Sequence, residues 1–98
     1  MYGTVARLNV KPGMEAEVAA FGESWKTGRK PRVKGVVGGY LYRLDTDPHT
    51  IIMAVVFDDK AAYHANAQDP AQDTEYQRLR ALLTQDPIWE DGEIIATL

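Results

Sequence analysis

Residues 50–57 read TIIMAVVF, and this stretch decides the fold because nearly every position in it is apolar. Neighbouring side chains of a strand point to opposite faces, so both faces of this strand carry apolar groups. One face would hold Ile51, Met53, Val55 and Phe57, and the other Ile52, Ala54 and Val56. An antiparallel sheet with helices on one face and water on the other normally alternates apolar and polar residues. The stretch therefore predicts a sheet that is covered on both faces.

The rest of the chain supplies cover for only one of these faces, so a second copy of the chain is the simplest source of the other. We expect a homodimer in which two sheets pack face to face. Each large apolar side chain would then contribute roughly 1.5–3 kcal/mol on burial. The alternative is a monomer in which this strand is central and has one face shielded.

Upstream of this stretch, the sequence predicts a strand, a helix and a second strand. Positions 2–10 alternate with a mainly apolar even face, and a KPG turn ends that strand. Apolar residues then recur at the spacing of an amphipathic helix that ends near Gly28, namely Met14, Val18, Phe21 and Trp25. Another strand is expected over residues 35–44, where Gly38 and Gly39 indicate a bulge or a close backbone approach.

Downstream of this stretch, turn residues separate two further helices and a last strand. The sequence DTDPH at 45–49 predicts a hairpin into the apolar strand. The pair Asp58-Asp59 is typical of a helix N-cap, and Asp69-Pro70 breaks the helix that follows. These elements are expected over residues 60–67, 71–84 and 88–97.

The predicted order of elements is β-α-β-β-α-α-β in one domain, residues 1–98. Two right-handed β-α-β units joined through a hairpin form a ferredoxin-like fold. We therefore expect an α+β protein with an antiparallel sheet and helices on one face. A chain of 98 residues leaves no room for a second core.

The composition excludes several classes of function. The chain has no Cys and only two His, which excludes disulfides, thiolate nucleophiles and Cys-based metal sites, and we expect no metal. A net charge of −3 argues against a nucleic-acid partner. The longest apolar run, residues 51–57, is too short to cross a membrane. The first ten residues lack the pattern of a signal peptide, so a cytoplasmic protein is expected.

The space between the sheet and the helices is the predicted small-molecule site. Trp25 and Phe21 would face it from the first helix, joined by Tyr63, Asn66 and Tyr76 from the later helices. A largely apolar, aromatic pocket with a few polar groups is the usual character of such a site. For Phe21 and Trp25 the alternative is ordinary core packing.

Two residues of the short helix are candidate catalytic groups. Asn66 would donate a hydrogen bond to a substrate carbonyl, and the alternative is an Asn that faces water at a helix end. His64 would serve as a base near neutral pH, but it lies about 100° around the helix from Tyr63 and is otherwise a surface residue. His49, in the hairpin turn, is expected to face solvent.

A basic segment follows the first helix and holds Lys26, Arg29, Lys30, Arg32 and Lys34. Such a cluster would bind an anion or an acidic partner surface. The alternative is a solvated loop. No glycine-rich phosphate loop follows a strand, so nucleotide binding is weakly supported.

Two segments carry a resemblance to a known family. VARLNVKPGMEAEVAAF covers the first strand and helix, and VVFDDKAAYHANAQDPAQDTEYQRLRALL covers the end of the third strand and the later helices. Together they resemble the antibiotic-biosynthesis-monooxygenase-like domains of the dimeric α/β-barrel superfamily. The resemblance implies sheets that pair face to face in a homodimer. It also implies an activity found in that family, either oxidation of aromatic polyketides or quinols without metal or flavin, or heme degradation.

Three positions depart from the heme-degrading members of that family. By this resemblance, the heme-degrading members carry an Asn where this chain has Ala6 and a Trp where it has Asn66. Their heme-ligating His would fall among residues 76–80, where this chain has no His. We therefore expect no heme and no other cofactor. Cofactor-free monooxygenases often use Asn and Trp near the short helix; Asn66 matches that pattern, and the Trp is absent.

The sequence thus predicts a small-molecule enzyme that resembles the cofactor-independent monooxygenases and acts on an aromatic or quinol-like substrate. The alternative is a non-catalytic ligand-binding or interaction dimer on the same scaffold, because a fold does not decide a function.

Overall fold

A computed structural model describes all 98 residues and has the α+β class and element order that the sequence predicts. None of its helices combines the length and the hydropathy that crossing a membrane requires. The strands are β1 (Tyr2–Asn9), β2 (Val36–Arg43), β3 (Thr50–Phe57) and β4 (Ile88–Glu93). The helices are α1 (Glu15–Ser24), α2 (Lys60–Ala67) and α3 (Pro70–Arg80), with a π-helical turn, Trp25–Arg29, and a 3-10 turn, Lys30–Arg32, after α1.

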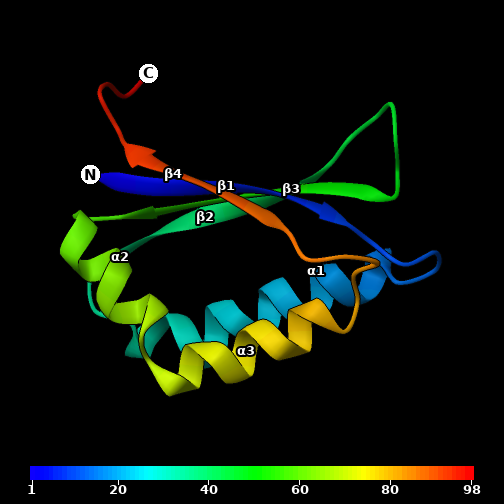
Figure 1. Cartoon of the computed structure of the whole chain (residues 1–98), viewed down its shortest axis with the longest axis horizontal. Coiled ribbons are helices and arrows are strands. Elements are labelled where there is room, and N and C mark those ends of the chain that lie inside the picture. The colour runs from blue at the N-terminus through cyan, green and yellow to red at the C-terminus, as the bar shows by residue number, and fades with distance from the viewer.

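The four strands form one antiparallel sheet in the order β2-β3-β1-β4, and all helices lie on one side of it (Figure 1). The apolar strand β3 is therefore central, between β2 and β1. This arrangement confirms the predicted ferredoxin-like fold. It leaves the second face of the sheet without cover from its own chain.

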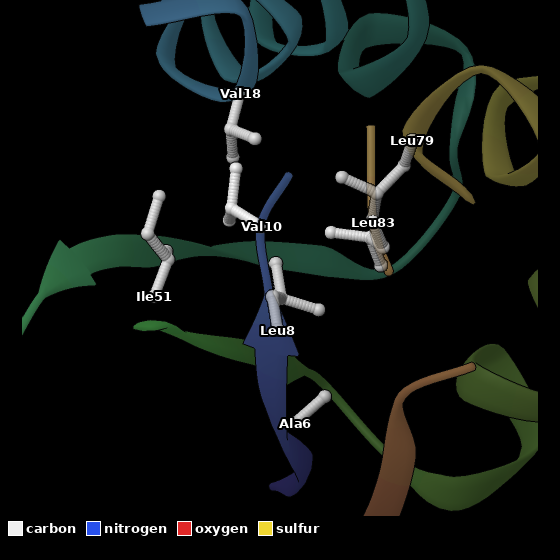
Figure 2. Packing of buried hydrophobic residues seen from close by; sticks show 7 residues of the cluster. All are labelled: Ala6, Leu8, Val10, Val18, Ile51, Leu79 and Leu83. Atoms are coloured by element: carbon white, nitrogen blue, oxygen red, sulfur yellow. The ribbon is translucent and has the colours of Figure 1, made fainter. Parts of the chain in front are cut away.

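The core lies between the helices and the inner face of β1. Leu8 is fully buried there, and it packs with a set of side chains that come from all parts of the chain (Figure 2). The other members are Ala6, Val10, Val18, Ile51, Leu79 and Leu83. Alternate residues of β1 point into this cluster, as the period of a strand requires. The helical stripe meets the sheet at Val18.

The helix caps and the ends of the last elements follow from local chemistry. Asp59 caps α2 by accepting a hydrogen bond from the Ala62 backbone N–H at 2.7 Å, as predicted. Helix α3 ends at Arg80, short of the expected residue 84, because Leu83 leaves the helix to form a bridge with Val10. Strand β4 ends at Glu93, short of residue 97, because its partner Tyr2 is the first residue of β1.

The predicted irregularity of β2 is confirmed. The register shifts between Val36 and Gly38, which is a bulge, and the next residue, Gly39, lies very close to β3. A Cβ on Gly39 would be 2.3 Å from the Ala54 carbonyl oxygen. The two strands can pair at this distance only because position 39 has no side chain.

The outer face of the sheet is mainly apolar and uncovered, with Arg7 and Glu90 as charged residues on it. Val5 lies near its centre and is 45% exposed, and Tyr40 and Ile88 near its edges are 77% and 74% exposed. Ile52, Ala54 and Val56 complete it from β3. This is the second apolar face that the sequence of β3 predicts.

Candidate functional site

A cavity of about 790 Å³ lies between the inner face of the sheet and the helices. Fourteen of the 24 residues that line it are hydrophobic, so its walls are mainly apolar. Five of the six predicted site residues are among them: Phe21, Trp25, Tyr63, Asn66 and Tyr76. The structure therefore brings these side chains together from three helical segments. Trp89 of β4, which the sequence does not predict as a site residue, also lines the cavity, and its ring centroid is 6.3 Å from that of Tyr76.

The sixth predicted residue, His64, does not line the cavity. It is exposed, and its ring lies against Tyr63 with the centroids 5.5 Å apart. This placement follows from the helix, because successive residues project about 100° apart. His49 is also exposed, its Nδ1 pairs with a Glu15 carboxylate oxygen at 2.6 Å, and neither residue lines the cavity.

A buried arginine organises the polar end of the cavity. Arg29 is 8% exposed, and its Nη2 donates to Asn66 Oδ1 at 2.9 Å and to Asp69 Oδ2 at 3.1 Å. Its Nε donates to Gln72 Oε1 at 3.5 Å. The hydrogen bonds from Arg29 and from the Ala71 backbone hold the pKa of the Asp69 carboxyl below its usual value, the backbone bond being the larger cause.

The π-helical turn explains how Arg29 reaches this position. The Lys30 backbone N–H bonds to the Trp25 carbonyl five residues earlier, which widens the helix by one residue at its end. Trp25 lines the cavity from the same turn, and its Nε1 donates to Gln72 Oε1 at 3.4 Å. Gln72 thus accepts hydrogen bonds from Trp25 and Arg29, and it holds the Trp25 indole at the cavity wall.

Arg29 determines which way the Asn66 amide points. A guanidinium can only donate hydrogen bonds, so the Asn66 atom that faces it must be the oxygen. The amide nitrogen therefore points away from Arg29, and no protein group accepts a hydrogen bond from it. No buried side-chain nitrogen or oxygen in the protein lacks a partner, so this nitrogen is accessible rather than sealed in the core. It is a free donor on a residue of the cavity wall.

A second polar group sits where Tyr63 meets the sheet. Its hydroxyl donates to Asp91 Oδ1 at 2.9 Å, and the same oxygen accepts from Thr4 Oγ1 at 2.6 Å. Burial, and then the hydrogen bond to the Asp91 carboxylate and its charge, raise the pKa of Tyr63 to about 12. Tyr63 is therefore a neutral donor at physiological pH and is unsuited to act as a phenolate base.

This pKa predicts how stability changes in alkali. Tyrosine in the unfolded chain ionises at its usual pKa of 10.0, whereas folded Tyr63 holds its proton to about 12. Ionisation between these values favours the unfolded state, so stability falls as pH rises from 10 to 12. The Tyr63→Phe variant lacks this contribution, and we expect its denaturant midpoint to fall less steeply over that range. Equal slopes in urea titrations of the two proteins would contradict the raised pKa.

Sequence reasoning missed Arg29, Gln72, Thr4 and Asp91. The sequence places Arg29 in a basic segment that is predicted to be an anion site or a solvated loop, whereas the structure buries it against polar side chains. Its partners lie 37 to 43 residues further along the chain, so no local pattern reveals them. His, Asp and Glu side chains nowhere gather in a group of three or more that would suit a metal ion.

Comparisons with known proteins agree with this fold. Residues 1–78 match the family model described as antibiotic biosynthesis monooxygenase. No curated protein matches the sequence significantly.

Solved structures of similar fold include proteins with and without an assigned activity. One, an antibiotic biosynthesis monooxygenase, is 14% identical with a TM-score of 0.77, and the match covers 98% of this chain and 100% of that one. A candidate antibiotic biosynthesis monooxygenase from Caulobacter crescentus is 17% identical with a TM-score of 0.82, covering 97% and 90%. A protein of unknown function from Nitrosomonas europaea is 24% identical with a TM-score of 0.79, covering 99% and 91%. At these identities the likeness shows the fold alone.

Proposed function

Since the chain belongs to the antibiotic biosynthesis monooxygenase family, we propose that it oxidises an aromatic or quinol-like small molecule without metal or flavin. The observation that carries the proposal is the Asn66 amide, which Arg29 holds with its nitrogen free beside an aromatic cavity. The cavity volume, about 790 Å³, lies within the range of roughly 300–1,000 Å³ that is typical of small-molecule sites.

In the proposed reaction the substrate is its own reductant. A ring C–H beside a carbonyl, or the O–H of a quinol, loses its proton to solvent and gives an anion whose charge is shared between the ring carbon and the oxygen. The anion adds dioxygen to form a peroxide, which then eliminates water and leaves a carbonyl. One oxygen atom of dioxygen enters the product and the other leaves as water, so no cofactor is needed for the electron balance.

The residues of this chain supply orientation and charge stabilisation for that reaction. The rings of Phe21, Trp25 and Tyr76 hold the flat body of the substrate and exclude water. The Asn66 amide donates to the substrate oxygen on which negative charge develops, as donors of an oxyanion hole do. Arg29 is a positioning residue, because it acts on the substrate through Asn66.

Replacing Asn66 with Ala tests this role. Arg29 keeps Asp69 and Gln72 as partners, so the variant is expected to fold with little loss of stability. Removal of one oxyanion donor typically lowers kcat about 10²–10³-fold, and we expect a loss of that order. Oxygen uptake and thermal shift with a panel of quinols and aromatic ketones provide the measurement.

The matched control for that experiment is Gln68→Ala. Gln68 is exposed at the end of the same helix and does not line the cavity, so its replacement should leave turnover unchanged. Turnover by Asn66→Ala at the rate of the unaltered protein would remove Asn66 from the mechanism.

A non-catalytic ligand-binding or interaction dimer remains the second candidate, and one observation favours it. No histidine lines the cavity, so the walls offer no imidazole base for the first proton transfer. Ligand binding in the thermal-shift panel without oxygen uptake would support this function over the enzyme.

We also propose that the protein works as a homodimer joined through the outer face of its sheet. The exposed apolar residues of that face, Val5, Tyr40 and Ile88 among them, support this assembly. Face-to-face pairing of two such sheets would give each β3 the second cover that its sequence requires.

A further inference from the structure

Lys30 is a cation that borders the cavity and has no anionic partner in the protein. It begins the 3-10 turn that follows the π-helical turn, and it is only partly exposed. Both Lys30 and Lys26 line the cavity, yet none of the four ion pairs of the protein includes either lysine. A lysine that lines a mainly apolar cavity without an ion-pair partner can form a charge-assisted hydrogen bond to an anion bound there.

The strand opposite Lys30 presents no side chain to its ammonium group. The Lys30 Nζ atom lies 3.6 Å from the place that a Cβ on Gly38 would occupy. Gly38 has a φ of 153° and is followed by Gly39, so two residues without side chains face this end of the cavity. The ammonium group therefore lies against bare backbone, and no side chain of this strand competes for it.

The acidic residues of the cavity do not neutralise Lys30. Glu23 and Asp73 also line it, but both are exposed to solvent and neither pairs with a lysine. Water screens exposed carboxylates effectively. Lys30 is therefore a positively charged group without an ion pair, at the part of the cavity wall that Gly38 and Gly39 form.

We infer that the cavity binds an aromatic molecule that carries an anionic group such as a carboxylate, and that Lys30 binds this group. The inference rests on the proposed function, because it assigns a charge to the ligand of the same cavity. The aromatic body packs against Phe21, Trp25 and Tyr76, and the charged substituent contacts Lys30 from the cavity side. Lys30 is then the residue of the basic segment that binds an anion, as the sequence predicts for that segment.

A pair of compounds with the same ring system, one charged and one neutral, provides the test. Calorimetric titration with 2-naphthoate and 2-naphthamide compares the same ring system with and without a carboxylate. We expect 2-naphthoate to bind about tenfold more tightly, as a charge-assisted contact of about 1.4 kcal/mol would give. Lys30→Met should abolish this preference and leave 2-naphthamide affinity unchanged, while Lys30→Arg should keep it.

Lys34→Met is the matched control, since it makes the same chemical change at an exposed lysine that does not line the cavity. It should bind both compounds as the unaltered protein does. Equal affinity for the two compounds, or an equal loss of both in Lys30→Met, would overturn the role of Lys30 and leave the aromatic cavity standing. If neither compound bound, the aromatic cavity of the proposed function would fail as well.

Discussion

A chain carrying Val5→Asp will scatter light as a monomer of about 10.9 kDa, whereas the unaltered chain will have about twice that mass. Val5 lies near the centre of the outer sheet face, on β1, opposite Ala54 of β3 and Glu90 of β4. In the proposed homodimer this face is dry. An aspartate there would be buried beside the Glu90 carboxylate, which repels it, while Arg7 of the same face lies two residues further along β1 and not opposite it.

The expected effect is large because a two-fold dimer contains the substitution twice. An uncompensated buried charge costs roughly 3–5 kcal/mol, so two copies would weaken the dimer by more than about 10⁴-fold. The folded monomer should survive, since Val5 is already 45% exposed in the single chain. Far-ultraviolet circular dichroism should therefore match that of the unaltered protein while the mass halves.

Gln77→Asp serves as the control for Val5→Asp. It adds the same charge at an exposed position of α3, in the helical layer away from the outer sheet face, and should leave the dimer intact. A mass of 10.9 kDa for the unaltered chain at micromolar concentration would refute the assembly itself.

Gly39→Ala should strongly destabilise this protein. Its Cβ would lie 2.3 Å from the Ala54 carbonyl oxygen and 3.1 Å from the Val55 Cα, both of them backbone atoms that cannot rotate away. Strands β2 and β3 would have to separate locally. Overpacking commonly costs about 1–3 kcal/mol, and a backbone clash should reach at least the upper value.

A loss of about 3 kcal/mol corresponds to a fall in Tm of more than roughly 12 °C for a domain of this size. The control is Gly28→Ala, where a Cβ would meet nothing within 4 Å and where the φ angle is also not positive. Its Tm should stay the same or rise, because alanine favours helical conformations. Calorimetry that finds similar Tm values for the two variants would contradict the close approach of the strands.

The fold could be predicted from the sequence because its signals are local. Three features can be recognised from a few consecutive residues: the two apolar faces of β3, the Asp59 cap and the glycine pair of β2. The structure confirms all three. The same holds for the helical spacing that brings Phe21 and Trp25 to the cavity.

The polar half of the site could not be predicted, because its contacts join distant parts of the chain. Thr4 and Asp91 are 87 residues apart, and Arg29 meets Asn66 across 37 residues. The π-helical turn matters as well, since one additional residue per turn redirects Arg29 from solvent to the interior. Regular helical periodicity does not indicate such a turn, so the sequence alone groups Arg29 with the solvated residues next to it.

The position of β1 between β3 and β4 has a consequence for synthesis on the ribosome. The first strand to be made is central in the finished sheet, and its second neighbour, residues 88–93, is made only after the helices. At about 5–20 residues per second, β1 waits roughly 4–16 s for β4. During that interval one edge of the nascent β1 strand is open to pairing with other chains. Chaperones that shield exposed strand edges would therefore act on this protein before residue 88 emerges.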